Sequence, residues 1–367
     1  MKIENLVRKG ILEIPPYIPG KSKEEAMKEV RAPKIIKMAS NENPLGPSPL
    51  AVKAINDSNL LNNLHIYPEG NSPMVVKELS EIFNIPETWI AVSNGADNII
   101  TLIGHSFINE GDEVIIPFPS FAMYNIITRI MGGVPIIVPL KDFHIDLEGM
   151  LNKVTKKTKL IFLCIPNNPT GTIITEKKLN NFFDSLSDNI LVIIDEAYYD
   201  FITDNNYKDA LHYIKENRNV IAVRTLSKIL GLAGLRVGYA IAKDEIIDCL
   251  LRVREPFPLT TISQMAAVNG LRDKEFFEKS RQVVKEGKEY LYNELTKRDI
   301  EYIPTQSNFI FINMKKDSRV IFDEFLKNGI IIRPGYIWGY DHYIRVSIGT
   351  MEENRFFIKT IDKLLEV

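Results

Sequence analysis

The sequence predicts an α/β fold, with a mostly parallel seven-stranded sheet in a large unit and a smaller α+β unit after it. Seven short runs rich in β-branched residues alternate with helical patterns, and several are apolar throughout, as is typical of strands covered on both faces. These runs are residues 90–92, 113–116, 135–138, 159–165, 190–194, 220–224 and 237–242. Between two of them, Ile99, Ile103 and Phe107 recur at helical spacing and predict an amphipathic helix over residues 98–108. Such alternation is typical of α/β layers built on a parallel sheet.

The pattern changes after about Arg254. A long, charged amphipathic helix is predicted over residues 274–298, followed by strands and two shorter helices. The strands are expected at residues 308–312, 330–333 and 343–348, and the helices at residues 319–328 and 353–365. This mixture indicates the smaller α+β unit.

Composition is that of an ordinary globular enzyme. With 367 residues the chain is about two domains long and amply large for a packed core. Apolar residues make up 45% and charged residues 25%, which excludes a disordered or fibrous protein. The formal net charge of −2 gives no electrostatic reason to expect nucleic acid as a partner.

Neither a metal site nor a membrane segment is expected. Cys164 and Cys249 are too few for a disulfide framework and lack metal-ligand spacing, as do the five histidines. No apolar run approaches the roughly 20 residues that a membrane helix requires. Residues 1–13 are of mixed charge and lack the apolar stretch of a signal peptide. We therefore expect a cytoplasmic protein with no membrane partner.

The residues around Lys228 point to a chemistry. Thr225, Ser227 and Lys228 follow an apolar run directly, and Arg236 lies eight residues after the lysine. Upstream, Asp195 stands at a predicted strand end, and Tyr198 follows it three residues later. Asn168 precedes both, in an Asn-Asn-Pro-Thr-Gly segment. Pyridoxal phosphate needs these parts: an amine for its aldehyde, hydroxyls and an arginine for its phosphate, an acid for its ring nitrogen, and donors for its ring oxygen.

Each part has a chemical reason. Removing a proton next to the substrate nitrogen leaves a carbanion, which survives only if the ring accepts its electrons. Asp195 is the candidate for keeping the pyridine nitrogen protonated, so that the ring can do this. Lys228 is then placed to carry the proton between the two carbons that exchange it. Asp195 and Thr225 at strand ends also fit the rule that ligands bind at the carboxyl edge of parallel sheets.

These motifs, in this order, resemble the fold-type I aminotransferases, and most of all the histidinol-phosphate aminotransferases. The resemblance covers nearly the whole chain, and its further motifs are residues 16–21, 39–49, 67–70, 94–97, 119–124 and 343–350. The Ser-Asn-Glu-Asn-Pro segment at residues 40–44 and the Pro-Asn-Asn-Pro-Thr-Gly segment at residues 166–171 favour this branch over the aspartate enzymes.

The resemblance implies a division of the chain and a homodimer with shared active sites. Residues 1–30 would form an arm that reaches the partner subunit. Residues 31–50 would fold with residues 255–367 as the small unit, and residues 51–254 would form the large unit that binds the cofactor. Tyr67 would reach across the dimer to the phosphate of the neighbouring cofactor.

More cofactor contacts follow from the resemblance. Gly95, Ala96 and Asp97 form the turn that the family uses for the cofactor phosphate, and free amides at a helix N-terminus suit an anion. Asp97 could instead be an N-cap, a common use of Asp. Phe121 occupies the position at which the family stacks an aromatic ring on the pyridine.

The same resemblance implies the substrates. Arg345 would hold a substrate carboxylate through a planar two-point contact that lysine cannot copy. One guanidinium can then serve glutamate and 2-oxoglutarate in one half-reaction and the phosphate of histidinol phosphate in the other. Arg333 is expected to help with that phosphate, and the resemblance puts Tyr17 and Asn43 at the substrate end of the pocket.

Phe257 departs from the family pattern. Histidinol-phosphate aminotransferases often carry a tyrosine in the segment where this chain has Pro-Phe-Pro-Leu-Thr at residues 256–260. A ring without a hydroxyl suits an apolar substrate side chain, which keeps open an aromatic amino acid aminotransferase.

Two further classes of pyridoxal protein compete with a transaminase. Threonine-phosphate decarboxylases share the Asn-Asn-Pro-Thr-Gly type of motif, but the segments around Asp195 and Lys228 favour a transaminase. A pyridoxal-binding transcription regulator would need a DNA-binding segment ahead of the domain, whereas the aminotransferase pattern starts by about Pro16. The sequence therefore favours the transaminase over both.

Overall fold

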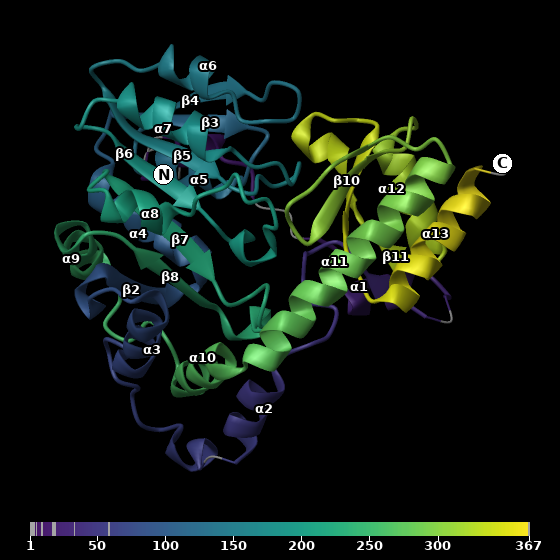
Figure 1. Cartoon of the computed structure of the whole chain (residues 1–367), viewed down its shortest axis with the longest axis horizontal. Helices are drawn as coiled ribbons and strands as arrows, with labels where there is room; N and C mark the ends of the chain where they lie inside the picture. The colour runs from purple at the N-terminus through teal and green to yellow at the C-terminus, as the bar shows by residue number, and fades with distance from the viewer. Residues whose placement is uncertain are drawn as a thin grey trace.

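The structure, a computed structural model, describes residues 4, 6–8, 10–16, 20–32, 34–57 and 59–365. The chain forms a large part around one sheet and a smaller part beside it, and a long helix, α11 (Lys274–Lys297), runs between them (Figure 1). None of the helices within the described ranges is long and apolar enough to cross a membrane.

All seven predicted strands of the large sheet are present, which confirms a mostly parallel seven-stranded sheet. They are β2 (Ile90–Asn94), β3 (Glu113–Phe118), β4 (Val134–Pro139), β5 (Thr158–Cys164), β6 (Leu191–Asp195), β7 (Val220–Thr225) and β8 (Val237–Ile241). Their order is β2-β8-β7-β6-β5-β3-β4, and only β8 runs antiparallel to its neighbours. Every residue of β6 and β7 is buried, which explains why these runs are apolar rather than alternating.

Helices cover both faces of this sheet. One face packs on α4 (Gly95–Phe107), α5 (Met123–Ile130) and α9 (Asp244–Val253). The other packs on α3 (Pro73–Phe83), α7 (Glu176–Asp184), α8 (Ala210–Lys215) and α10 (Thr261–Arg272). Because side chains alternate along a strand, Ile193 of β6 faces the α4 and α5 layer while Ile194 faces the opposite core.

Helix α4 begins earlier than predicted. It starts at Gly95 rather than at residue 98, and Asn94 occupies the N-cap position. Asp97 is therefore the third residue of the helix, and the interpretation of Asp97 as an N-cap is wrong.

The smaller part contains two sheets. The four-stranded antiparallel sheet has the order β12-β13-β10-β9, and β1 pairs with β11 in parallel. The strands are β1 (Ile36–Lys37), β9 (Tyr302–Ile303), β10 (Phe309–Asn313), β11 (Ile330–Ile331), β12 (Arg333–Pro334) and β13 (Tyr343–Ser347). Its helices are α1 (Lys23–Glu29), α12 (Ser318–Lys327) and α13 (Met351–Leu365). The predicted single strand at residues 330–333 is wrong, because its two halves pair with different partners, β1 and β13.

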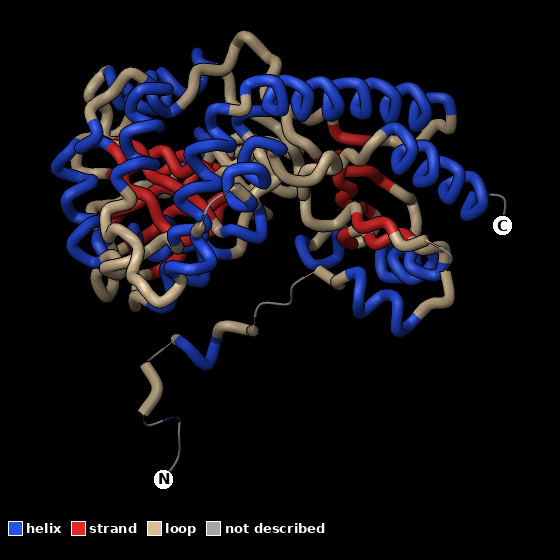
Figure 2. The backbone as a smooth tube through the Cα atoms, turned by 90° about the horizontal axis from the view of Figure 1, so that it is seen from below, coloured by secondary structure: helices blue, strands red, loops and turns tan. Residues whose placement is uncertain are grey.

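The two predicted units are not separated by clear boundaries in this fold. Helix α10 packs on α2 (Pro49–Asn56) and α3, so it lies with the large part (Figure 1). Part of the predicted arm is the helix α1, whose Ala26 packs with Leu326 and Ile331 of its own chain. Figure 2 shows the segment before α1 leading away from the smaller part, and Glu13 within it pairs with Arg129 of α5 at 3.2 Å. The division of the chain stays a prediction.

Candidate active site

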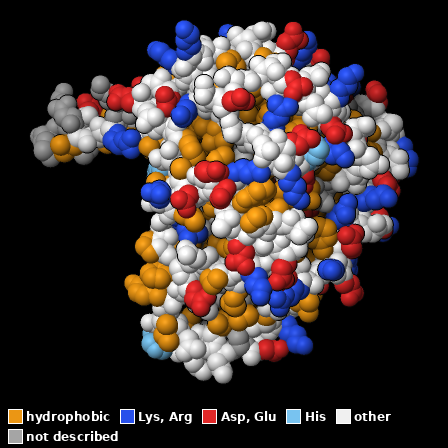
Figure 3. Space-filling model, turned by 60° about the vertical axis from the view of Figure 1, so that its left-hand side comes forward, with side chains coloured by type: hydrophobic (Ala, Val, Ile, Leu, Met, Phe, Trp, Pro, Cys, Tyr) orange, Lys and Arg blue, Asp and Glu red, His pale blue; other side chains and the backbone are white. Residues whose placement is uncertain are grey.

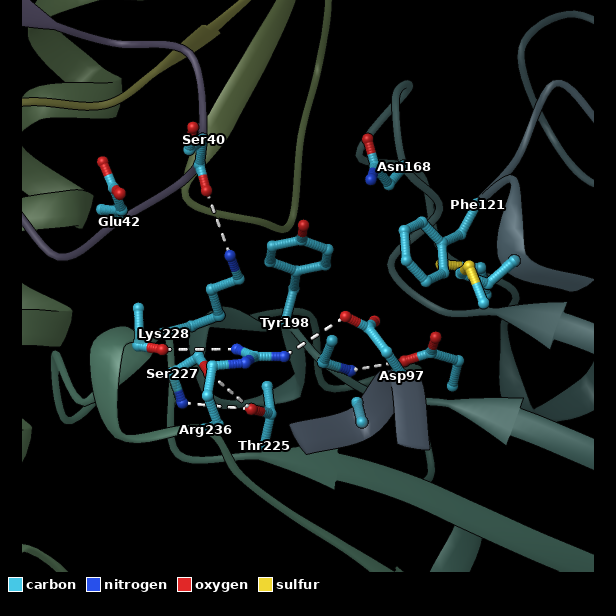
Figure 4. Close-up of a pocket in the computed structure, with 16 residues that line it drawn as sticks. Ser40, Glu42, Asp97, Phe121, Asn168, Tyr198, Thr225, Ser227, Lys228 and Arg236 are labelled. Carbon is cyan, nitrogen blue, oxygen red and sulfur yellow. Dashed lines mark hydrogen bonds and ion pairs between the residues drawn. The ribbon is translucent and has the colours of Figure 1, made fainter. Parts of the chain in front are cut away.

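A cavity of about 430 Å³ lies at the carboxyl ends of β5, β6 and β7, where segments of both parts meet (Figure 4). Most of the predicted cofactor residues line it: Ala96, Asp97, Phe121, Asn168, Asp195, Tyr198, Thr225, Ser227, Lys228 and Arg236. The parallel strands bring these residues together because their carboxyl ends share one edge of the sheet.

Lys228 reaches into this cavity from the turn after β7. Its Nζ donates a hydrogen bond to the carbonyl oxygen of Ser40 at 3.1 Å (Figure 4). Burial, together with the nearby positive charge of Arg345, lowers the pKa of Lys228 to about 8. A lysine with such a pKa keeps an appreciable neutral fraction near neutral pH, which a nucleophile or a proton carrier requires.

Asp195 ends the buried strand β6 and is 3% exposed. Its Oδ2 accepts a hydrogen bond from the Tyr124 hydroxyl at 2.7 Å, and its Oδ1 accepts one from the Ala197 amide at 3.0 Å. Burial raises the pKa of Asp195 to about 6, and these two donors oppose that rise.

A group of polar side chains gathers near the N-terminus of α4. Arg236 Nη2 lies 3.2 Å from Asp97 Oδ2, and the Ser227 amide donates to Thr225 Oγ1 at 3.1 Å. A Cβ atom on Gly95 would lie 2.4 Å from Arg236 Nη2, and Gly95 has a φ of 83°. Glycine therefore lets the guanidinium approach the first turn of α4, whose free amides favour an anion.

Arg345 of β13 does not line the cavity itself but bonds a residue that does, Asn168. This arginine is 6% exposed, and its guanidinium lies 5.3 Å from the ring centre of Phe309 and 5.2 Å from that of Trp338. It donates to the side-chain oxygen of Asn168 and, at 2.6 Å, to the carbonyl oxygen of Ala39. The arginine is therefore held in a fixed orientation next to the cavity.

Tyr198 and Phe121 stand on other walls of the cavity. The Tyr198 hydroxyl accepts a hydrogen bond from Asn41 at 3.0 Å, and burial raises the pKa of Tyr198 to about 12. The Tyr198 hydroxyl therefore stays protonated and can still donate. Phe121 presents its ring to the cavity in Figure 4.

Several predicted residues do not line this cavity. Asn43 uses its amide to bond Ile229 O and Ser280 Oγ, both at 2.8 Å, so the structure does not bring it into the pocket. Arg333 and Arg345 stand across from each other in the β12–β13 register, and both are absent from the lining. Arg345 is connected to it through its bond to Asn168. Gly95 precedes the lining residue Ala96 but is not itself part of the lining, and Tyr17 lies outside the described residues.

Tyr67 lies on a neighbouring surface. Its side chain is 78% exposed, and its ring stacks on Phe257 with 4.5 Å between ring centres. Leu64 and Ile66 are also exposed. Figure 3 shows apolar side chains between the charged ones on one face of the molecule. Arg236 lines both the cavity and the groove that Tyr67 and Phe257 border.

The sequence reasoning missed three contributors. Tyr124 contacts Asp195, the Ser40 carbonyl accepts from Lys228, and the Asn41 amide reaches Tyr198. All three lie inside motifs that carry the family resemblance, but which atoms meet depends on the packing of separate elements. Throughout the described part of the chain, no three or more His, Cys, Asp or Glu side chains lie close enough together to hold a metal ion.

The similarity of this chain to known proteins shows its family. The family model described as aminotransferase class I and II matches residues 33–361. The chain belongs to the class I and II aminotransferases.

Two relatives of this aminotransferase are named histidinol-phosphate aminotransferase. The protein of Moorella thermoacetica is 43% identical over 359 residues, which cover 98% of this chain and 92% of that protein. The protein of Caldicellulosiruptor saccharolyticus is 42% identical over 360 residues, which cover 98% and 100%. The aminotransferase fold itself is matched by the crystal structure of histidinol-phosphate aminotransferase from Sinorhizobium meliloti in complex with pyridoxal-5'-phosphate. That chain has a TM-score of 0.87 and 23% identity, with 97% of this chain and 98% of that chain covered.

Proposed function

We propose that this aminotransferase uses pyridoxal phosphate to move the amino group of histidinol phosphate to 2-oxoglutarate, a step of histidine biosynthesis. The observation that carries the proposal is that an amine, Lys228, and an acid, Asp195, line one cavity, while an anion-binding group, Arg345, bonds Asn168 of the same lining. Relatives of 42–43% identity over 98% of the chain, named histidinol-phosphate aminotransferase, support the substrate.

The residues around the cavity fit pyridoxal phosphate. The amides of the α4 N-terminus, the hydroxyls of Thr225 and Ser227, and Arg236 offer a phosphate several donors in one corner. The missing Cβ of Gly95 leaves room for this approach. Asp195, with its carboxylate in the buried floor, suits a protonated ring nitrogen, and Asn168 and Tyr198 suit the ring oxygen.

When bound, pyridoxal phosphate supplies an aldehyde carbon for amines and a ring that accepts electrons. The chain supplies the proton chemistry. Lys228, with its pKa lowered to about 8, takes a proton at Nζ from one carbon and returns it to the other. Asp195 would hold a negative charge against the ring nitrogen at a buried position, where the low dielectric strengthens the interaction between the two.

Arg345 is the proposed anion anchor for both substrates. A guanidinium can bind a carboxylate or a phosphate through two donors, and that of Arg345 is held near Phe309 and Trp338 by its bonds to Asn168 and Ala39. Arg333 stands across from it in the antiparallel register, so a second positive charge lies nearby for the phosphate ester.

We also propose a homodimer with shared sites. The exposed Tyr67 and Phe257 border a groove that Arg236 connects to the cavity, so a second copy covering this face would bring its own Tyr67 near the site. Large exposed apolar surfaces of this kind mark association sites. The arm of residues 1–30, the other domain limits and a cytoplasmic location remain predictions.

A substrate panel tests the proposal. Each charge-assisted contact contributes about 1.5–3 kcal/mol, so losing two should cost at least about a hundredfold in kcat/KM. Histidinol phosphate should therefore exceed histidinol by that factor or more, with phenylalanine and tyrosine slower still. If an aromatic amino acid matched histidinol phosphate, the aromatic specificity that Phe257 leaves open would replace this proposal. Release of carbon dioxide from threonine phosphate would favour the decarboxylase.

A matched pair of variants isolates the anion anchor. Arg345→Lys keeps the charge but removes the fork of two donors, and it should lose most of the preference for the phosphorylated substrate. Arg319→Lys is the control, because Arg319 is a half-exposed arginine of the same unit that pairs with Asp317. Equal substrate preference in the two variants would remove Arg345 from the proposed role.

A further inference from the structure

Tyr124 is not one of the predicted site residues, yet it contacts Asp195 directly. It stands in the first turn of α5, on the layer that covers one face of the large sheet, and it is fully buried. Its hydroxyl donates to Asp195 Oδ2 at 2.7 Å. In the sequence, Tyr124 stands only as the last residue of the motif at residues 119–124.

The ring of Tyr124 is held by its aromatic neighbours. It stacks on Phe162 of β5 with 4.5 Å between ring centres and 11° between planes, and the ring of Phe121 meets it edge-on at 5.7 Å. Rings packed in this way do not turn freely. The hydroxyl is therefore held against one oxygen of Asp195, and the Ala197 amide holds the other. The carboxylate cannot rotate without breaking one of these bonds.

The charge of Asp195 also depends on Tyr124. Burial is the main cause that raises the pKa of Asp195, and the nearby charges of Asp97 and Glu196 raise it further. The groups that favour the charged form are two neutral donors, the Tyr124 hydroxyl first and then the Ala197 amide. Hydrogen bonds to the charged form are what keep a buried carboxylate ionised without a cation.

We propose that Tyr124 is a positioning residue that keeps Asp195 charged and oriented for the ring nitrogen of the cofactor. The proposal rests on the proposed function, since it gives Asp195 a pyridine partner. A purely structural Tyr124 would contribute packing only, and its hydroxyl would not alter how Asp195 responds to protons.

The test is the affinity of the cofactor-free protein for pyridoxal phosphate, measured by absorbance titration at a series of pH values. In the parent protein, affinity should fall on the acid side as Asp195 takes up a proton. We call this fall in affinity the acid limb of the pH profile. Tyr124→Phe removes one oxygen atom and should shift the acid limb to a pH about one to two units higher, the change expected for the loss of one hydrogen bond to a charged group. Activity is not needed for this measurement.

Two controls separate positioning from packing. Tyr213→Phe removes the hydroxyl of another buried tyrosine, on α8, whose oxygen makes no hydrogen bond within the described residues, and its acid limb should coincide with that of the parent. In the Asp195→Asn background the part of the acid limb that Asp195 causes should be absent, and adding Tyr124→Phe should change affinity by no more than about twofold, because both changes act through the same carboxylate.

The outcomes are distinct. An unmoved limb in Tyr124→Phe, or an undiminished effect in the Asp195→Asn background, would overturn the proposal and leave the proposed function intact. Absence of pyridoxal phosphate binding in the parent would overturn the proposed function as well. If Tyr124→Phe does not fold, 3,5-difluorotyrosine at position 124 keeps the ring and strengthens the donor. The limb should then move downward, and an upward or absent movement would overturn the proposal.

Discussion

Replacing Arg224 by methionine is expected to destabilise the protein through the charge that it leaves behind. Arg224 is 1% exposed and precedes Thr225, the β7 residue that lines the cavity. Because side chains alternate along a strand, Arg224 points to the other face of β7. Its guanidinium contacts Glu196 Oε2 at 2.7 Å and Asp209 Oδ2 at 3.0 Å, and it stacks over Tyr199 with 4.0 Å to the ring centre. Methionine retains much of the packing but leaves Glu196 buried without its cation.

The structure sets the size of this loss. Removing one partner of a buried ion pair costs about 3–5 kcal/mol, a large part of the roughly 5–15 kcal/mol that holds a domain folded. Glu196→Gln in addition removes the stranded charge. The glutamine oxygen can still accept from the Tyr207 hydroxyl and the Ala210 amide, now at 2.5 and 2.9 Å from Oε1. The double variant should therefore recover most of the stability that Arg224→Met loses.

The four proteins, the parent, the two single variants and the double variant, form a double-mutant cycle, and denaturant unfolding measures the free energy of unfolding of each. The deficit of Arg224→Met should also grow as pH rises. An unpaired, buried Glu196 has a raised pKa in the folded state, so its stabilising protonated form is lost as pH rises through that pKa. A loss below about 1 kcal/mol, or no recovery in the double variant, would refute the reasoning. Because Glu196 follows Asp195 in the chain, cofactor affinity should fall together with stability.

Asp195→Asn should lower kcat by roughly a thousandfold or more and affect cofactor affinity less, because the lost charge supports the transition state; stopped-flow and binding titration separate the two. Lys228→Ala should bind pyridoxal phosphate without turnover, and borohydride should fix the cofactor to the Lys228 peptide of the parent only. Mixing Tyr67→Ala with Lys228→Ala by unfolding and refolding should restore activity, since one pocket of a heterodimer then has both residues; no gain would remove the shared-site proposal. Gly95→Ala should weaken cofactor binding about tenfold in a titration, because an L-residue is strained at this backbone angle and its Cβ would displace Arg236.

Much of the fold and the centre of the candidate site could be read from the sequence. Asp195 and Thr225 end buried strands, and Lys228 lies three residues after Thr225. Because the carboxyl ends of parallel strands share one edge, local pattern and one topological rule suffice to bring the three together. The start of α4 was less predictable. Glycine at residue 95 disfavours a helix by propensity, whereas its contact with Arg236, far along the chain, is what makes a glycine fit there.

The sequence could not predict which elements, far apart along the chain, lie side by side. The segment at residues 330–333 has one continuous apolar pattern, yet its halves join two sheets because different strands lie beside them. Asn43 was expected at the substrate end of the pocket, but its amide donates to the Ile229 carbonyl and the Ser280 hydroxyl.

By itself the sequence determined the α/β class, the seven strands and the set of reactive groups, because periodicity and strand-end position are local properties of the chain. Only the tertiary structure decided that Tyr124 bonds Asp195 and that Arg224 bonds Glu196, since each pair joins separate elements. A hydrogen bond forms or fails over fractions of an ångström, and side-chain packing between elements sets that distance.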